Sequence, residues 1–233
     1  MESIKANIER IRNDIAAAAL KSGRLPSDVK LMAVTKTVDD ERIRQAIDAG
    51  VDLIGENYVQ EAQRKMDILG RTVPWHFIGR LQTNKAKFAV RLFDMIHSVD
   101  RIELVSELDK RSKSAGCMAK ILIEVNLSGE LTKSGVPKEN VFDLVRQAAA
   151  FDNISIQGLM TMPPWFDDPE DSRPYFTELR VLKEAVAALR IHGVEMNELS
   201  MGMSADYAVA VQEGATIVRI GRSLFGERPV RPR

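Results

Sequence analysis

Short apolar runs alternate with longer amphipathic segments along almost the whole chain. We predict strands at eight of these runs, which cover residues 31–34, 52–57, 75–79, 95–99, 120–127, 154–162, 198–203 and 216–221. Between most of them, apolar residues recur every three or four positions, a spacing typical of helices with one buried face. Strands joined through helices run parallel, because each connection crosses over the sheet in the same right-handed sense. The pattern therefore predicts an α/β fold.

The number of these units favours a closed barrel. Eight strand–helix units in 233 residues fit a (β/α)8 barrel, which typically needs about 250 residues. The alternative, an open doubly wound sheet, usually has a glycine-rich turn after its first strand, and here that strand runs into Lys36-Thr-Val-Asp-Asp40. We predict a single barrel domain over 1–233, made of an N-terminal helix (1–22), the barrel itself (29–226) and a basic, proline-rich tail (227–233).

The composition excludes several classes of protein. The chain has 33 basic and 33 acidic residues, so it has no excess charge to attract nucleic acid or a membrane surface. A lone cysteine, Cys117, excludes an internal disulfide and predicts a reducing compartment. The N-terminus lacks the apolar stretch of a signal peptide, and no run approaches the roughly 18 apolar residues that span a bilayer. We predict a cytoplasmic protein, monomeric or weakly dimeric.

Lys36 is the first candidate for chemistry. It follows the first strand, and the C-terminal ends of all strands in such a barrel meet at one mouth. A lysine amine that is partly removed from water loses its proton more readily and then attacks carbonyl groups. Lys36 is therefore a candidate nucleophile, although most lysines are merely solvated.

The ends of the last two strands suggest an anion site. Gly202-Met-Ser204 precedes a helix that we predict to begin near Ala205, with Ser204 as its cap. Gly221 and Arg222 follow the last strand, and Gly221 would let backbone amides approach a ligand. Barrels frequently bind phosphate with the loops after strands seven and eight. The alternative is that both glycines only permit tight turns.

Arg219 is unusual because it lies inside an apolar run, where a charge is costly unless it is paired or functional. Two explanations remain open. Arg219 could face the ring nitrogen of a pyridine and keep it unprotonated, or it could form a salt bridge with Glu56 across the barrel. A ligand that is both phosphorylated and electrophilic would suit all these strand ends, and pyridoxal 5'-phosphate is the simplest such molecule.

Three other features have simpler interpretations. His76 and His97 lack a second histidine at metal-ligand spacing, so we expect them to pack in the core or mouth and predict no metal site. Residues 163–174 form a surface loop or, alternatively, a lid that contributes Trp165 and Phe166. Met160 and Met203 lie at strand ends, where their thioethers could flank a flat ring.

Motifs along the chain resemble those of the pyridoxal phosphate homeostasis proteins. They are Ala33-Val-Thr-Lys36, Gly55-Glu-Asn-Tyr-Val-Gln-Glu61, Trp75-His-Phe-Ile-Gly-Arg-Leu-Gln-Thr-Asn-Lys85, Lys133-Ser-Gly135, Gly158-Leu-Met160, Leu199-Ser-Met-Gly-Met-Ser204, and Val218-Arg-Ile-Gly221 with Leu224-Phe-Gly226. Their joint occurrence in this order, from the first strand to the last, makes the resemblance specific.

The resemblance implies a barrel similar to the N-terminal domain of alanine racemases, with pyridoxal 5'-phosphate held as an aldimine. Lys36 would form the aldimine and Arg219 would face the pyridine nitrogen. The phosphate would be held by Ser204 and the backbone of Gly221 and Arg222. The residues implied around the ring are Asn57, Met160, Ser200 and Met203. Members often have a small hydroxyl residue where this chain has Arg222, so a hydroxyl contact there would need Ser223 instead.

The resemblance implies a carrier that buffers the cofactor, delivers it to apo-enzymes and has no established catalysis. An amino-acid racemase is the alternative, but racemisation needs an acid/base group on each face of the ring. In alanine racemases that second group is a tyrosine from another domain and a partner chain, for which this sequence has no room. A Schiff-base aldolase without cofactor would leave Arg219 unexplained. The recipient enzymes, and any part played by Lys133 in transfer, stay open.

Overall fold

The computed structural model describes residues 3–130 and 133–226. The main strands are β1 (Lys30–Val34), β2 (Leu53–Glu56), β3 (Trp75–Phe77), β4 (Met95–Val99), β5 (Ala119–Asn126), β7 (Ile154–Met160), β8 (Val194–Ser200) and β9 (Ile217–Ile220). All are parallel, and pairings of β1 with β9 and of β4 with β5 close them into a ring. The closed ring confirms the predicted (β/α)8 barrel and excludes the open doubly wound sheet.

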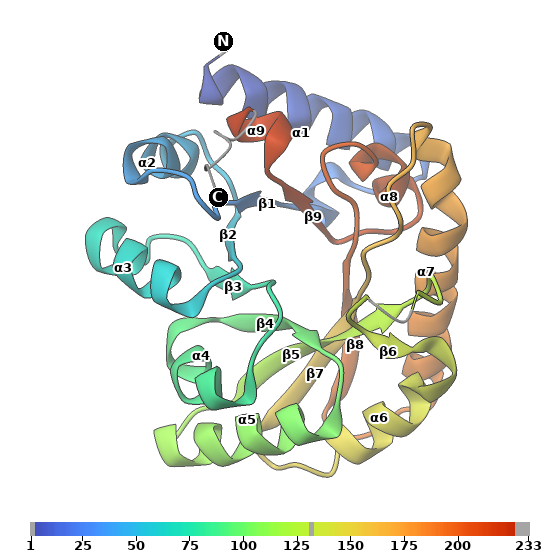
Figure 1. Cartoon of the computed structure of the whole chain (residues 1–233). Helices are drawn as coiled ribbons and strands as arrows, with labels where there is room; N and C mark the ends of the chain where they lie inside the picture. The colour runs from blue at the N-terminus through green and yellow to red at the C-terminus, as the bar shows by residue number, and fades with distance from the viewer. Residues whose placement is uncertain (1–2, 131–132, 227–233) are drawn as a thin grey trace.

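Helices surround the ring, as Figure 1 shows. They are α1 (Ile4–Lys21), α2 (Asp40–Asp48), α3 (Val59–Leu69), α4 (Ala86–Leu92), α5 (Ile102–Ala115), α6 (Val141–Ala148), α7 (Arg173–Ala188), α8 (Tyr207–Gln212) and α9 (Arg222–Phe225). Short 3-10 turns lie at η1 (Pro26–Asp28), η2 (Thr83–Lys85), η3 (Lys138–Asn140) and η4 (Pro169–Ser172). None of the helices in the described ranges is long and apolar enough to cross a membrane.

The N-terminal helix α1 is additional to the eight units of the barrel. Ile4, Ile8, Ile11 and Ile15 line its buried face, and the helix packs against α8, α9 and α2. Ser3 caps its first turn through a side-chain hydrogen bond from the backbone of Ala6. The helix therefore covers the part of the ring where the first and last strands meet (Figure 1).

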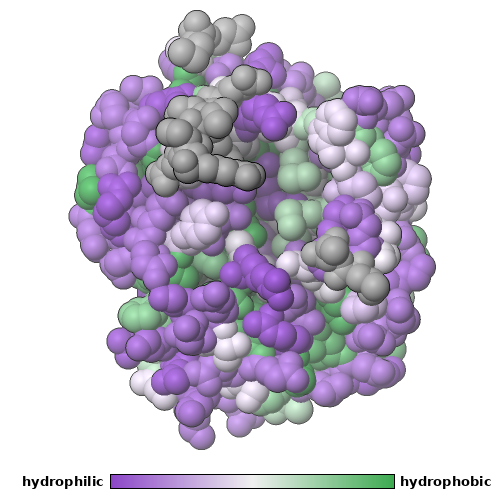
Figure 2. Space-filling model, viewed as in Figure 1, coloured by the Kyte–Doolittle hydropathy of each residue, from purple (hydrophilic) through white to green (hydrophobic). Residues whose placement is uncertain are grey.

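Most apolar side chains lie between the strands and the helices, while a smaller set fills the barrel itself. Met32, Leu53 and Ile217 form one internal cluster, and Met95, Leu122 and Met160 form another. In Figure 2, which views the same face, hydrophilic residues dominate the outer ring and more apolar residues appear toward the centre. The barrel is thus a packed core with a polar opening at one end.

Three local expectations differ from the structure. A two-residue strand, β6 (Val136–Pro137), pairs beside β5 outside the ring and was not predicted. The helix expected near Ala205 begins at Tyr207, because Met203 to Asp206 form a turn in which the Asp206 carboxylate accepts the Met203 N–H at 2.6 Å. The last strand, for which no clear helix was expected, is followed by α9. The predicted tail over 227–233 lies outside the described residues.

Candidate functional site

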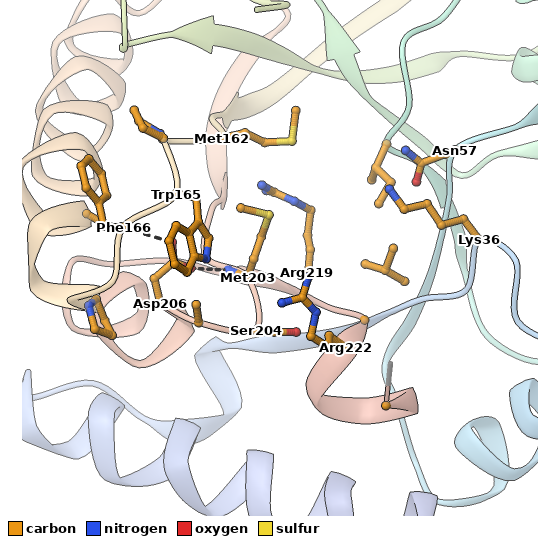
Figure 3. Close-up of a pocket in the computed structure, with 18 residues that line it drawn as sticks. Lys36, Asn57, Met162, Trp165, Phe166, Met203, Ser204, Asp206, Arg219 and Arg222 are labelled. Atoms are coloured by element: carbon orange, nitrogen blue, oxygen red, sulfur yellow. Dashed lines mark hydrogen bonds between the residues drawn. The ribbon is translucent and has the colours of Figure 1, made fainter. Parts of the chain in front are cut away.

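A cavity of about 540 Å3 opens at the C-terminal ends of the strands. Seven of the nine predicted site residues line it: Lys36, Asn57, Met203, Ser204, Arg219, Gly221 and Arg222. Figure 3 shows Lys36 and Asn57 on one side, Arg219, Ser204 and Arg222 in the middle, and Trp165 and Phe166 opposite Lys36. The fold therefore brings an amine, a cation and hydroxyl and backbone groups from distant parts of the chain to one opening.

The backbone beside Lys36 is held by a buried lysine that sequence reasoning missed. Lys65 of α3 is completely buried and donates to the Thr35 backbone oxygen at 2.6 Å, to Glu56 at 2.6 Å and to Glu61 at 2.7 Å. The Glu61 carboxylate also accepts the backbone N–H of Thr37 at 2.7 Å. The residues on both sides of Lys36 are thus tied to one charged cluster.

In this cluster one ammonium group faces two carboxylates, and the pKa values of the two carboxylates shift in opposite directions. Burial raises the pKa of Glu56, although Lys65 beside it opposes the rise. Partial burial alone would also raise the pKa of Glu61, but hydrogen bonds from Lys65 and Thr37 outweigh it and lower the pKa. The second oxygen of Glu56 has no hydrogen-bond partner among the described residues. Because Thr37 has φ of 63°, an uncommon conformation for a non-glycine residue, the cluster also holds a strained backbone next to Lys36.

Arg219 is 4% exposed and is hydrogen-bonded inside the barrel. Its guanidinium donates to the Ser200 hydroxyl at 2.7 Å and to the Thr161 backbone oxygen at 2.9 Å. The salt bridge to Glu56 that the sequence left open does not form, because Glu56 is paired with Lys65. Burial lowers the pKa of Arg219 to about 10, against the opposing effects of Asp206 and Glu124. Arg219 therefore remains a cation at neutral pH.

A buried hydrogen-bond chain continues from Arg219 into the barrel. The Ser200 hydroxyl lies 3.0 Å from Nδ1 of His97, and Nε2 of His97 lies 2.9 Å from Nδ1 of His76. Burial lowers the pKa of His76 to about 4 and that of His97 well below its usual value, so both rings are neutral. Since Arg219 only donates, each of these contacts is a hydrogen bond if Ser200 donates to His97 and His97 donates to His76. These hydrogen bonds fix the tautomers behind Arg219, and both histidines are packed inside the barrel, as expected.

Ser204 joins the last two loops, and the prediction that it caps α8 is wrong. Its hydroxyl accepts the backbone N–H of Ser223 at 3.1 Å, and the Ser223 hydroxyl donates to the Ser204 backbone oxygen at 3.2 Å. The helix begins three residues later, at Tyr207, where Asp206 is the preceding residue. Because the Ser204 hydroxyl oxygen is the acceptor in this contact, its hydrogen can donate to a ligand in the cavity, which Gly221 and Arg222 also line.

Part of the loop predicted over 163–174 forms one wall of the cavity. Pro164, Trp165 and Phe166 of this loop line it, together with the preceding Met162, and Trp165 is 71% exposed. The ring of Phe166 packs against Tyr175, with 5.8 Å between the centroids. This loop is therefore part of the site, while its possible movement as a lid stays a prediction.

The donor set of the cavity fits a phosphorylated aldehyde. Lys36 supplies an amine on one side, and Ser204 and Arg222 supply anion-binding groups elsewhere on its lining. Asn57 stands beside Lys36, and its side-chain oxygen is buried with no hydrogen-bond partner among the described residues. No group of three or more histidines, cysteines or carboxylates in that part of the chain could hold a metal ion.

Comparisons with known proteins show the family of this chain. Residues 1–229 match the family model described as the N-terminal domain of alanine racemase. The chain is 45% identical over 222 residues to the pyridoxal phosphate homeostasis protein of Aquifex aeolicus, a match covering 95% of this chain and 96% of that protein. The chain belongs to this family.

Two solved structures extend the comparison. PipY of Synechococcus elongatus with pyridoxal phosphate bound is 36% identical, with a TM-score of 0.80, and the match covers 91% of this chain and all of PipY (100%). An alanine racemase of Clostridium difficile is 17% identical with a TM-score of 0.71, over 98% of this chain and 57% of the racemase. The racemase likeness concerns the fold alone. This member of the homeostasis family thus spans little more than half of that enzyme.

The two remaining predicted residues lie outside the lining of the cavity. Ser200 is hydrogen-bonded to Arg219, and Met160 belongs to the internal apolar cluster of the barrel. Any influence of these two residues on a ligand would pass through Arg219 or through packing. Lys133, the second lysine singled out in the sequence, pairs with Glu130 at 2.7 Å and does not line the cavity.

Glu124 is a further polar residue that sequence reasoning did not identify. It is 3% exposed on β5, and burial and the charge of Asp100 raise its pKa to about 7, while Arg219 and Arg80 oppose the rise. A signal was available in the sequence, because Glu124 is the one charged residue within the apolar run Ile121–Val125. A charged residue within an apolar run is also what identified Arg219 in the sequence.

Proposed function

We propose that this protein binds pyridoxal 5'-phosphate at the barrel mouth and serves in the homeostasis of that cofactor, holding and releasing it without turnover. The observation that carries the proposal is the position of Lys36 at one cavity with Arg219, Ser204 and Arg222. The PLP-bound structure of PipY, 36% identical to this chain, supports the same ligand.

Lys36 would hold the cofactor covalently. When bound, the cofactor supplies an aldehyde that reacts with the Lys36 amine, forming a C=N bond and releasing one water molecule. The reaction needs the neutral amine, and its reverse needs water to reach the same carbon. A cavity that opens to solvent permits both directions, which suits a protein that stores and returns its ligand.

The other lining residues would orient the cofactor. Ser204, Arg222 and the backbone at Gly221 would hold the phosphate, and Asn57 and Met203 would contact the ring. Arg219 carries only donor groups, so a ring nitrogen facing it would accept a hydrogen bond and stay unprotonated. An unprotonated ring is a weaker electron sink than one paired with a carboxylate. Arg219 therefore favours holding the cofactor over using it.

The tyrosines support a non-catalytic role. The hydroxyl of Tyr207 donates to Asp14 of α1 at 2.6 Å, Tyr175 packs against Phe166, and Tyr58 is 58% exposed. None of the three lines the main cavity in the described chain. A racemase needs a second acid/base group opposite the lysine, and no tyrosine here occupies that position.

Borohydride reduction followed by peptide mass mapping tests the covalent link. We expect one pyridoxyl adduct on Lys36 that is lost in Lys36→Ala, whereas Lys87→Ala, which removes an exposed lysine of α4, should leave it unchanged. An adduct that maps elsewhere in the wild-type protein would refute the assignment of Lys36.

Two assays separate a carrier from an enzyme. Incubation with alanine and other amino acids should give no racemisation at enzymatic rates, while incubation with an apo-enzyme that requires the cofactor should restore its activity as the yellow colour leaves this protein. Sustained racemisation that depends on Lys36 would instead establish the racemase alternative.

A further inference from the structure

A second cavity of about 710 Å3 adjoins the main one, and Asn57 lines both. It lies at the ends of β2 and β3, between the start of α3 and the turn η2. Its size exceeds what a single ion needs and falls within the range of small-molecule sites. A Cβ at Gly79, on its wall, would lie 2.3 Å from the Asn57 backbone oxygen, so this wall is fixed by close packing of two strand ends.

The lining of this second cavity is strongly basic. Arg80, Lys85 and Arg101 line it, and no acidic residue does. Arg101 is neutralised by Asp100 at 2.6 Å, but Arg80 and Lys85 have no ion-pair partner among the described residues. Arg80 interacts at longer range with Glu124, which does not line the cavity. Two cations thus face the same hollow without a local counter-charge, which favours an anionic ligand.

Backbone donors add to these charges. The first backbone N–H of α3 with an acceptor is that of Ala62, which bonds to Tyr58, so those of Val59 and Gln60 have no acceptor among the described residues. No side chain caps this 11-residue helix. Donors of this kind, together with arginine and lysine side chains, are the usual partners of phosphate oxygens.

We propose that this second cavity binds the phosphate group of another phosphorylated molecule, separately from the site at Lys36. Arg80 and Lys85 would neutralise the phosphate, and the start of α3 would donate to its oxygens. The volume leaves space for an organic group beyond the phosphate. Because Asn57 lines both cavities, a ligand in one cavity would change the affinity of the other for its own ligand.

Amide NMR of the full chain, titrated with inorganic phosphate, tests the site. The main cavity is first filled by borohydride reduction with pyridoxal phosphate, so that Ser204 and Ser223 no longer respond. We expect saturable shifts at Val59, Gln60 and Glu61. Replacing both cations (Arg80→Gln with Lys85→Gln) should weaken phosphate binding about tenfold or more. The control Lys87→Gln, which removes a nearby exposed charge outside the cavity, should leave the affinity unchanged.

A parallel titration with pyridoxine 5'-phosphate, which lacks the aldehyde, identifies the source of the phosphate. Tighter binding than inorganic phosphate indicates an organic ester, and equal binding indicates the free ion. Absence of shifts at the start of α3, or equal shifts in the double variant, would overturn the proposal. If no adduct forms on Lys36, the proposed function fails, yet the α3 amides of the untreated protein still report on this second site.

Discussion

The Lys65 ammonium group lies 2.6 Å from the backbone oxygen of Thr35, the residue immediately before Lys36. Its charge is shared with Glu56 and Glu61, and Glu61 in turn holds the backbone N–H of Thr37. The nucleophile therefore sits on a segment fixed from both sides by one buried lysine. Its position depends on Lys65, which lies 29 positions further along the chain and does not line the cavity.

We expect Lys65→Met to lower the free energy of unfolding by about 3–5 kcal/mol, because it leaves the buried Glu56 carboxylate without its cation. Urea denaturation measures this loss. We also expect slower formation of the borohydride-trapped adduct on Lys36 under conditions where the variant stays folded, since the Thr35 to Thr37 backbone loses its anchor.

The double variant Glu56→Gln with Lys65→Met separates charge from geometry. It should recover part of the stability, since the fully buried charge at Glu56 is removed and the Glu61 carboxylate, which also loses Lys65, is partly exposed. It should not recover the rate at which Lys36 reacts. Full recovery of the reaction rate in the double variant would show that the cluster does not position Lys36.

The raised pKa of Glu124 should make the stability of the protein depend on pH. Its pKa in the folded protein is raised from 4.5 to about 7, so between these values the folded state binds the proton more strongly than the unfolded state does. Stability is therefore greatest at the acidic end of this range and falls as pH rises toward 7, by up to about 3 kcal/mol. Thermal unfolding of wild type and Glu124→Gln measures the difference.

The expected result is that Glu124→Gln matches the wild type near the acidic end of the range and exceeds it above neutral pH. Glu195→Gln, near the start of β8, is a suitable control because its side chain is exposed. A constant offset between Glu124→Gln and wild type at every pH would mean that Glu124 does not titrate in this range.

Trp165 should report directly on ligand binding. It lines the main cavity and is 71% exposed, whereas Trp75, the other of the 2 tryptophans, is fully buried. Pyridoxal phosphate bound at Lys36 should quench the emission of Trp165, and the fluorescence of Trp165→Phe should change little on addition of the cofactor. Quenching that persists in that variant would place the cofactor nearer to Trp75.

The barrel was predictable because each strand carries its own apolar run, and that signal is local. Arg219 was also predictable, since a charge inside such a run is visible in the sequence. Lys65 was not, because on an amphipathic helix with Glu61 four residues earlier it looks like an ordinary surface pair. Its burial depends on how α3 packs against β2 and the residue that follows β1, which no local pattern encodes.

The error at Ser204 has a related cause. Serine before a helix favours a cap, but here a turn precedes α8 and the Asp206 carboxylate binds the Met203 N–H instead. Ser204 is hydrogen-bonded to Ser223 of the next loop. Contacts between two strand-to-helix loops arise only when the barrel closes, so the sequence could place both residues at the mouth without pairing them.

Ser200→Ala tests the buried chain behind Arg219. The Ser200 hydroxyl contacts Arg219 at 2.7 Å and His97 at 3.0 Å, so its loss leaves a buried donor and a buried acceptor unsatisfied. We expect the free energy of unfolding to fall by about 1–3 kcal/mol for each unsatisfied group. The ring-nitrogen chemical shifts of His97 should also change, because its Nδ1 loses the only donor that the described residues offer. Ser114→Ala, at an exposed hydroxyl that bonds within its own helix, should change neither property. Unchanged His97 shifts in Ser200→Ala would show that Ser200 does not set the tautomer of this ring.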